Sequence, residues 1–296
     1  SDGFNEIKCN SLISAKYFNQ DDKSIVRICN PLSADLAIMR PTPIIGGLET
    51  IVFNVHHKIS DLKLFEFGRT YHANTEIAEL SKIERYYESK FLALWITGNK
   101  DVLSWNQKEK PSDFFTLKSY VIKITTRLGI DLVELNEDFV SDSNFEYALQ
   151  YKYKEIVFCS FGKLNAKLAK STDCDKDVFY AEINWDLVKE LVAKNKISYK
   201  SISRFPTVKR DLALVIDKNI SYKQMVDLAK KTEPNYISEV NLFDVYEGKN
   251  IEQGKISYAL SFSLDDHEKT MTDKQINKIM ERLIKAFETE LNAILR

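Results

Sequence analysis

Neither sign of charge dominates this sequence, which has 42 Lys and Arg residues, 43 Asp and Glu residues and a formal net charge of -1. Net charge therefore gives no indication of a nucleic-acid or membrane partner, and any RNA contact has to come from a local patch. No apolar run approaches the ~18 residues that a membrane span requires. The N-terminus carries no signal peptide. We therefore expect a cytoplasmic protein that contacts neither membrane nor DNA.

Cysteine is sparse, and its spacing excludes two kinds of site. The four cysteines are widely separated at Cys9, Cys29, Cys159 and Cys174. Without a CxxC pair, neither a zinc knuckle nor a redox motif is indicated. We expect buried free thiols in a reducing compartment.

The common catalytic motifs are missing as well. Gly46-Gly47 lacks the Lys-Ser/Thr that a phosphate-binding loop requires, and no GxSxG nucleophile motif occurs. His56 and His57 are adjacent, so on a helix they point about a third of a turn apart and cannot share a metal ion. Asp265-Asp266 fits an ordinary acidic loop. The sequence predicts no catalytic residue and no metal site.

At 296 residues, two domains are expected. In residues 1–200 predicted strands outnumber helices and do not alternate strictly with them, which favours an α+β domain on an antiparallel sheet. Pro41, Pro43, Gly46 and Gly47 argue against a helix before Leu48. The predicted strands are 4–14, 24–30, 62–71, 86–98, 145–151, 155–162 and 177–184, and the predicted helices begin at 48, 112 and 186.

Residues 201–296 follow a clearer βαββαβ order, which is that of a ferredoxin-like domain. We expect strands over 210–217, 237–246, 255–264 and 293–296. Ser221 with Gln224 and Thr272 with Gln275 are capping boxes that begin two helices. In the third strand, large apolar residues alternate with Ser257, Ala259, Ser261 and Ser263, so one face is buried and the serine-rich face is free.

Basic and aromatic side chains gather at the junctions of this second domain. RNA recognition uses aromatic planes for unpaired bases and nearby cations for phosphates. The candidate residues are Arg204, Phe205, Lys209, Arg210, Phe243, Tyr246 and Lys249. From the pattern alone a structural role competes: Phe205 and Phe243 could be core, and Arg210 could pair with Asp211 or Asp244.

Several multi-residue motifs resemble a known family. Arg204-Phe205-Pro206, Arg210-Asp211-Leu212-Ala213, Leu242–Tyr246 with Gly248, Lys255–Phe262 and Lys269–Asp273 resemble the ferredoxin-fold anticodon-binding domain that ends the beta subunit of bacterial phenylalanyl-tRNA synthetases. In the first domain, Gly3–Ile7, Asn30–Ser33 with Met39-Arg40, and Leu64–Arg69 resemble the catalytic-like region of the same subunit. The likeness spans nearly the full chain. Pro41 and Pro43 depart from the family pattern, and residues 145–165 resemble it only faintly.

The resemblance implies a fold and a division of labour. It implies a class II aminoacyl-tRNA synthetase-like antiparallel sheet domain over 1–200, without an active site, and an anticodon-binding domain over 201–296. The partners implied are the alpha subunit, in an alpha2-beta2 assembly, and tRNA(Phe). ATP and magnesium would serve the whole enzyme and not this region, because a class II site needs a late arginine and Arg127 is the only arginine between Glu88 and Ser203. The chain starts without Met, and the family's editing and metal-binding modules would precede it.

Two alternatives stay open at this stage. The first domain could be an autonomous class II ligase, although the missing late arginine argues against it. The second could be a small-molecule regulatory module, since ferredoxin-like domains also bind amino acids.

Overall fold

The computed structural model describes residues 2–74, 83–195, 204–248, 251–266 and 269–296. The chain divides into two compact units, Ser1–Ile197 and Ser198–Arg296. Each unit has its own hydrophobic core.

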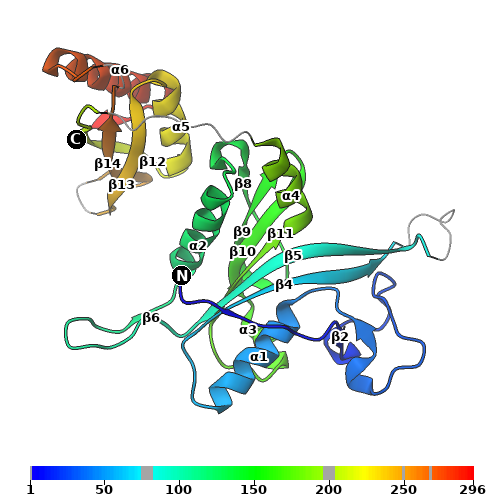
Figure 1. Cartoon of the computed structure of the whole chain (residues 1–296). Coiled ribbons are helices and arrows are strands. Elements are labelled where there is room, and N and C mark those ends of the chain that lie inside the picture. The colour runs from blue at the N-terminus through cyan, green and yellow to red at the C-terminus, as the bar shows by residue number, and fades with distance from the viewer. Residues whose placement is uncertain (1, 75–82, 196–203, 249–250, 267–268) are drawn as a thin grey trace. The chain divides into compact units, whose positions relative to one another are not determined.

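The first unit is built on a seven-stranded sheet (Figure 1). Its strands are antiparallel except for the first pair, in which β1 and β4 run parallel. In spatial order the strands are β1 (Asn5–Glu6), β4 (Leu62–Ala73), β5 (Tyr86–Thr97), β11 (Val178–Asn184), β10 (Ile156–Leu164), β9 (Phe145–Tyr153) and β8 (Asn136–Phe139). This α+β architecture confirms the expected fold class.

Short strand pairs and helices complete this unit. The pairs are β2 (Leu12–Ile13) with β3 (Ile38–Met39), and β6 (Asn99–Asp101) with β7 (Lys110–Pro111). The α-helices are α1 (Ile44–His56), α2 (Phe114–Arg127), α3 (Ala166–Ser171) and α4 (Trp185–Lys194). The three 3-10 turns are Ala15–Tyr17, Ala34–Leu36 and Leu132–Glu134.

The second half of strand β5, residues 91–97, is buried on both faces, and its two sets of side chains divide the core. Leu92, Leu94 and Ile96 pack with residues of α2 and α4. Phe91, Ala93 and Trp95 pack with residues of α1 on the other face. Because strand side chains alternate between faces and both faces are buried here, residues 91–96 form a continuous apolar run.

Two strands expected in the first 60 residues do not form as predicted. The strand expected over 24–30 does not form: Val26 and Ile28 bond to the 37–39 segment, but only an isolated bridge, Arg27 with Ile38, results. The strand expected over 4–14 is two short pieces, because the Asn10 side chain accepts a hydrogen bond from the Leu12 backbone and makes a turn.

Helix α1 begins at Ile44, four residues before the expected start, and contains both glycines. The glycines serve close packing instead of a loop. A Cβ on Gly47 would lie 2.1 Å from Cε2 of Trp95. Glycine lets the helix approach the sheet closely at this point, which the sequence alone does not reveal.

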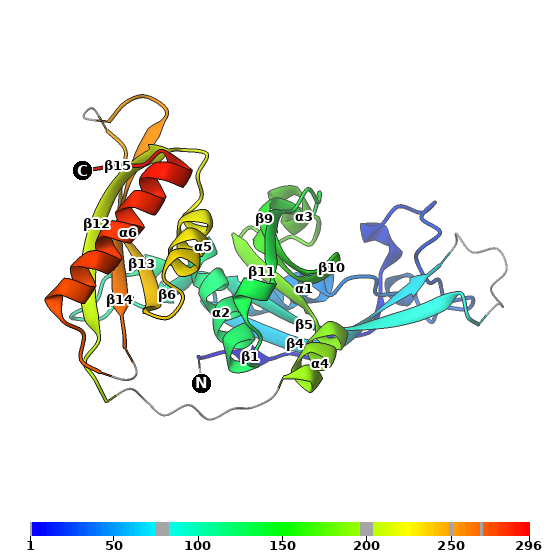
Figure 2. The same cartoon turned by 90° about the horizontal axis from the view of Figure 1, so that it is seen from above.

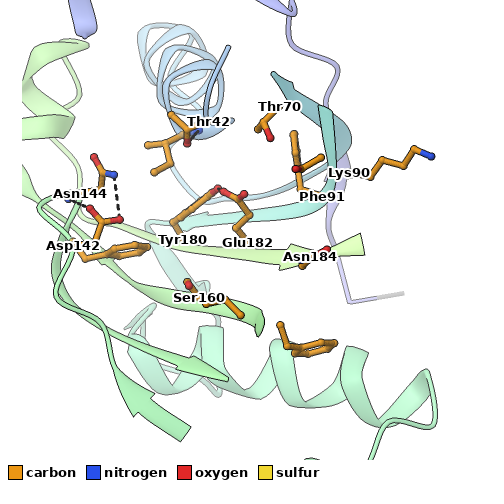
Figure 3. A pocket seen from close by; sticks show the side chains of 15 residues that line it. Thr42, Thr70, Lys90, Phe91, Asp142, Asn144, Ser160, Tyr180, Glu182 and Asn184 are labelled. Atoms are coloured by element: carbon orange, nitrogen blue, oxygen red, sulfur yellow. Dashed lines mark hydrogen bonds between the residues drawn. The ribbon is translucent and has the colours of Figure 1, made fainter. Parts of the chain in front are cut away.

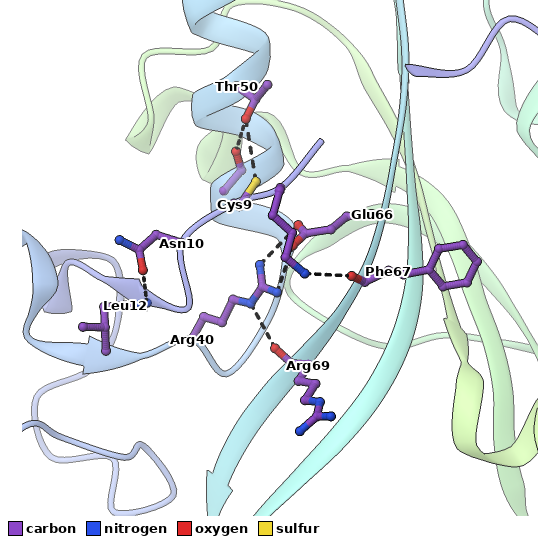
Figure 4. A network of polar contacts seen from close by, with 10 residues as sticks. Cys9, Asn10, Leu12, Arg40, Thr50, Glu66, Phe67 and Arg69 are labelled. Carbon is purple, nitrogen blue, oxygen red and sulfur yellow. Dashed lines mark hydrogen bonds and ion pairs between the residues drawn. The ribbon is translucent and has the colours of Figure 1, made fainter. Parts of the chain in front are cut away.

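A buried ion pair joins the segment before α1 to the sheet (Figure 4). Arg40 pairs with Glu66 of β4 at 2.9 Å, and both side chains are almost completely buried. Nε of Arg40 also donates to the Arg69 carbonyl at 2.9 Å. The guanidinium is thus held by a carboxylate and by main chain.

The second unit is the expected ferredoxin-like sheet, in the order β13-β14-β12-β15. All of its strand pairs are antiparallel. Its elements are β12 (Val208–Asp217), α5 (Tyr222–Thr232), β13 (Ile237–Tyr246), β14 (Lys255–Leu264), α6 (Asp273–Leu291) and β15 (Ile294–Leu295).

Both helices lie on one face of this sheet (Figure 2). Leu212, Leu214 and Ile216 of β12 form the core with apolar residues of α5 and α6. The two predicted capping boxes are present, so each helix starts with its first amides satisfied. The opposite face of the sheet carries no helix among the residues of this unit that the structure describes.

Candidate nucleic-acid interface

The face of the second sheet that carries neither α5 nor α6 is the candidate surface for RNA binding. Its middle is shallow, because the residues of β12 and β14 that point there are small. Direct cross-strand pairing aligns Ala213 with Ala259, and Asp211 with Ser261. Small side chains on a pleated surface leave room for a flat ring to lie on the sheet.

A β-bulge shapes the edge strand β13. Pairing with β14 shifts register between Leu242 and Asp244, so Phe243 is the extra residue. Bulges commonly re-aim a side chain near a functional surface. Phe243 is 55% exposed, so it does not belong to the core.

Tyr246 and Arg296 meet on this face. Tyr246 lies opposite Ser257, and the amide of Arg296 donates to the Ala213 carbonyl from the other edge of the sheet. The Arg296 guanidinium lies 5.1 Å from the centre of the Tyr246 ring. A guanidinium over an aromatic ring is a favourable cation–π contact, and Ser257 between the two edges is buried.

The predicted cations of the second domain do not all share one face. Lys209 and Arg210 are consecutive residues of β12, so their side chains point to opposite sides. Arg210 lies opposite Phe262 and reaches Asp273, at the start of α6, at 3.8 Å. Neither Asp211 nor Asp244 is its ion-pair partner.

The remaining predicted residues are placed as follows. Arg204 is exposed and Phe205 is partly buried, both just before β12. Lys249 lies outside the described residues. Arg296 was not among the predicted contacts. The sequence did place Arg296 in the expected final strand, 293–296. Extending the observed β15 register by one residue places it beside Ala213 on the free face.

The first unit contains a cavity of about 380 Å³ on the α1 side of its sheet (Figure 3). Glu182 of β11 lies within it and accepts a hydrogen bond from the Tyr180 hydroxyl. Burial raises the pKa of Glu182; the Tyr180 hydrogen bond and the Arg40 charge oppose this shift, and Asp142 adds to it.

This cavity does not fit a nucleoside triphosphate. Binding polyphosphate requires converging cations or free backbone amides. Two carboxylates, Glu182 and Asp142, line the cavity together with a single lysine, Lys90. Arg40 is already paired with Glu66. Arg127 ends α2, on the opposite face of the sheet.

The histidines and cysteines do not converge on a site. Among the described residues there is no group of three or more His, Cys, Asp and Glu side chains that could hold a metal ion. His57 ends α1, with Nδ1 2.7 Å from the Phe53 carbonyl, and burial lowers the pKa of His72. Cys159 and Cys174 are buried free thiols as expected, but Cys29 is exposed.

The arrangement of strands and helices defines the structural class of the protein. The chain is an α+β protein of two units, in which a large antiparallel sheet domain precedes a ferredoxin-like sheet with one free face. None of the helices in the described part of the chain is both long and apolar enough to cross a membrane.

Comparison with known proteins identifies the family. Residues 1–185 match the model of the phenylalanyl tRNA synthetase beta chain CLM domain, and residues 203–296 match the ferredoxin-fold anticodon binding domain. The chain belongs to the phenylalanyl-tRNA synthetase beta chain family.

Curated relatives agree with this assignment. The chain is 46% identical to the phenylalanine–tRNA ligase beta subunit of Bacteroides thetaiotaomicron and 37% identical to that of Porphyromonas gingivalis. Each match covers 99% of this chain but 37% of the relative. This chain therefore spans little more than a third of the length of these relatives.

A solved pyrrolysyl tRNA synthetase from Desulfitobacterium hafniense is also similar. It has a TM-score of 0.44 and 12% identity, and the match covers 63% of this chain and 62% of that chain. A likeness at this level is too weak to indicate function.

Proposed function

We propose that this chain is the part of a phenylalanine–tRNA ligase beta subunit that grips the anticodon stem-loop of tRNA(Phe). The observation that carries the proposal is the free face of the second sheet, within a region that matches an anticodon-binding domain. Tyr246, Phe243 and Arg296 supply exposed planes and a cation around a centre of small residues. Unpaired bases bind to surfaces of this kind by stacking.

The cations near this face would hold phosphates. Lys209 points to the free side of the sheet by its register, and Arg204 is exposed just before β12. Arg210 can act only at the rim, because it reaches toward Asp273 on the helix side. Lys249 remains a candidate from sequence.

The first unit would act as a scaffold for the alpha subunit, with catalysis located there. ATP and magnesium would bind to that partner, since the cavity of this unit is lined by two carboxylates and its lysine, Lys90, points away from Glu182. The docking segment proposed is 39–55. Most of its apolar side chains belong to this unit's own core, and Phe53, which is 63% exposed, is the residue most available for contact.

Filter binding of labelled tRNA(Phe) to the chain tests the anticodon-grip proposal. Tyr246→Ala should weaken binding by about 1–3 kcal/mol, the value of one stacked base. Tyr147→Ala is a matched control, since Tyr147 is an exposed tyrosine of the first unit. Equal affinity of the Tyr246 variant and the parent chain would contradict the proposed stacking.

The salt dependence separates phosphate contacts from stacking. Ala at Arg204 or Lys209 should reduce the slope of log affinity against log salt by about one each. Lys230→Ala is the control, because Lys230 is on α5 on the helix-bearing side. An unchanged slope in both variants removes these residues from the interface.

The two competing functions give different results in simple assays. An autonomous ligase would catalyse ATP–pyrophosphate exchange in the purified chain, whereas a scaffold would not. An amino-acid regulatory module would bind phenylalanine in calorimetry and would not bind tRNA.

A further inference from the structure

Two glutamates occupy equivalent positions on the α1 face of the large sheet. Glu66 of β4 and Glu182 of β11 are both directly opposite Ala93 of β5, which lies between them. Directly paired residues of neighbouring antiparallel strands point to the same face. The two carboxylates therefore stand in one row, separated by a methyl group, and Ser160 of β10 continues the row.

Among the described residues, one of these glutamates has an ion-pair partner and the other has none. Glu66 is paired with Arg40 at 2.9 Å. Across the ranges that the structure describes, no Lys, Arg or His nitrogen forms an ion pair with Glu182, whose hydrogen-bond partner is the Tyr180 hydroxyl. Lys90 lines the same cavity, but its side chain extends away from Glu182 (Figure 3). The charge of Arg40 acts on Glu182 from a distance, but Arg40 is already ion-paired with Glu66. A desolvated carboxylate without an ion-pair partner is unfavourable unless something else compensates it.

The cavity beside Glu182 has walls that suit an organic cation. Phe91, Phe145 and Tyr180 contribute aromatic surface, and aromatic faces attract ammonium groups. Asp142 adds a second carboxylate at the rim, and Thr42, Thr70, Ser160 and Asn144 add groups that hydrogen-bond. Its volume of about 380 Å³ lies in the usual range for small-molecule sites, roughly 300–1,000 Å³.

We propose that this cavity binds a small organic ammonium compound, with Glu182 as the counter-ion of the amine and the aromatic walls around its carbon skeleton. The proposal assigns a ligand site to the first unit and is independent of RNA binding by the second. Anionic ligands are disfavoured by the two carboxylates. A metal ion is disfavoured because no cluster of three ligating side chains exists among the described residues.

Calorimetry on the purified chain tests the proposal with two probes of the same shape. The probes are 2-phenylethylammonium and the neutral 2-phenylethanol. We expect saturable binding of the ammonium probe and at least tenfold weaker binding of the alcohol. No saturable binding of the ammonium probe, or equal binding of both probes, would overturn the proposal.

Substitutions then locate the site. Glu182→Gln should weaken ammonium binding by about tenfold or more, the value of a hydrogen bond to a charged group. Glu155→Gln makes the same chemical change at an exposed turn of the first unit and should leave binding unchanged. Unchanged binding by the Glu182 variant, or an equal loss in the Glu155 variant, refutes the assignment.

A second variant keeps the test decisive if Glu182→Gln does not fold. Ser160 is directly opposite Glu182, so Ser160→Lys places an ammonium group of the protein beside the carboxylate. This variant should lose binding of the probe while the chain stays folded. Retention of parent affinity by Ser160→Lys would show that the probe binds elsewhere.

Discussion

At the scale of single residues, the Arg40–Glu66 pair shows how this fold keeps charge inside. Both side chains are almost fully buried, and Arg40 also donates to the Arg69 carbonyl. Arg40 also stacks its guanidinium 5.2 Å from the centre of the Phe91 ring. Removing one partner leaves the other charge buried and unpaired, which is more unfavourable than removing both.

We therefore expect Arg40→Met to reduce the free energy of unfolding of the first unit by about 3–5 kcal/mol. The double variant Arg40→Met with Glu66→Gln should regain a large part of this loss. Tryptophan fluorescence during urea denaturation measures the effect, since Trp95, Trp105 and Trp185 all belong to the first unit. Equal losses in the single and double variants would show that the charge of Glu66 is not the cause.

The raised pKa of Glu182 predicts that the free energy of unfolding depends on pH. Because burial raises its pKa above the ordinary 4.5, the folded chain holds this proton more tightly than the unfolded chain does. The resulting stabilisation is fully present below pH 4.5, and it is lost as the pH rises through the folded-state pKa.

Glu182→Gln removes this contribution. The free energy of unfolding of the variant minus that of the parent should become more positive as the pH rises from 4.5 toward neutrality. Urea denaturation at several pH values, followed by tryptophan fluorescence, measures the difference. A flat difference for Glu182→Gln would show that its pKa is not raised.

At the scale of elements, helix α1 is placed by the contact of its glycines. Replacing Gly with Ala in a helix normally stabilises it by about 1 kcal/mol. At Gly47 the new Cβ would lie 2.1 Å from the fully buried ring of Trp95. At Gly46 it would meet the Cys9 side chain at 2.8 Å, on the irregular segment between β1 and β2.

Gly47→Ala should therefore destabilise the first unit by about 1–3 kcal/mol, as overpacking does. Gly46→Ala should lose less, because Cys9 is on a segment that can shift more easily than the core. Thermal unfolding, followed by tryptophan fluorescence, shows which of the two variants is less stable. The reverse order would mean that Trp95 relaxes more readily than the Cys9 segment.

The elements that sequence predicts well are those with a strong local signal. Asp113 caps α2 and Gly129, at φ +72°, follows its end, and both are visible as residue types at fixed positions. Strand β14 alternates cleanly and was placed correctly. The start of α1 was misplaced because Gly47 is required for close packing against Trp95, which is far away in sequence. Residues 24–30 have the composition of a strand, but their neighbours allow only one bridge.

At the scale of the whole molecule, family motifs located the unit that matches the anticodon binding domain, but they could not place its side chains. The free face, Phe243 and Tyr246 followed from alternation and from residue type. That Lys209 and Arg210 lie on opposite faces depends on the register of β12. The cation–π contact of Arg296 with Tyr246 depends on side chains from the two edges of the sheet reaching each other over β12 and β14. The cavity at Glu182 was not foreseen, since its walls come from five strands, helix α1 and two loops.

Because a different function is proposed for each unit, we predict that the two units can be separated and studied as fragments. Each unit has its own sheet and its own hydrophobic cluster, so residues 1–197 and 198–296 should each fold alone. The second fragment should bind tRNA(Phe) within a factor of about 3 of the full chain, or ~0.6 kcal/mol, and should not bind 2-phenylethylammonium. The first should bind the ammonium compound and show only weak, non-specific RNA binding. Filter binding and calorimetry on the two fragments, with circular dichroism as the check of folding, measure all four quantities. If tRNA binding by the folded second fragment fell tenfold or more, the first unit would have to contribute to the RNA interface directly.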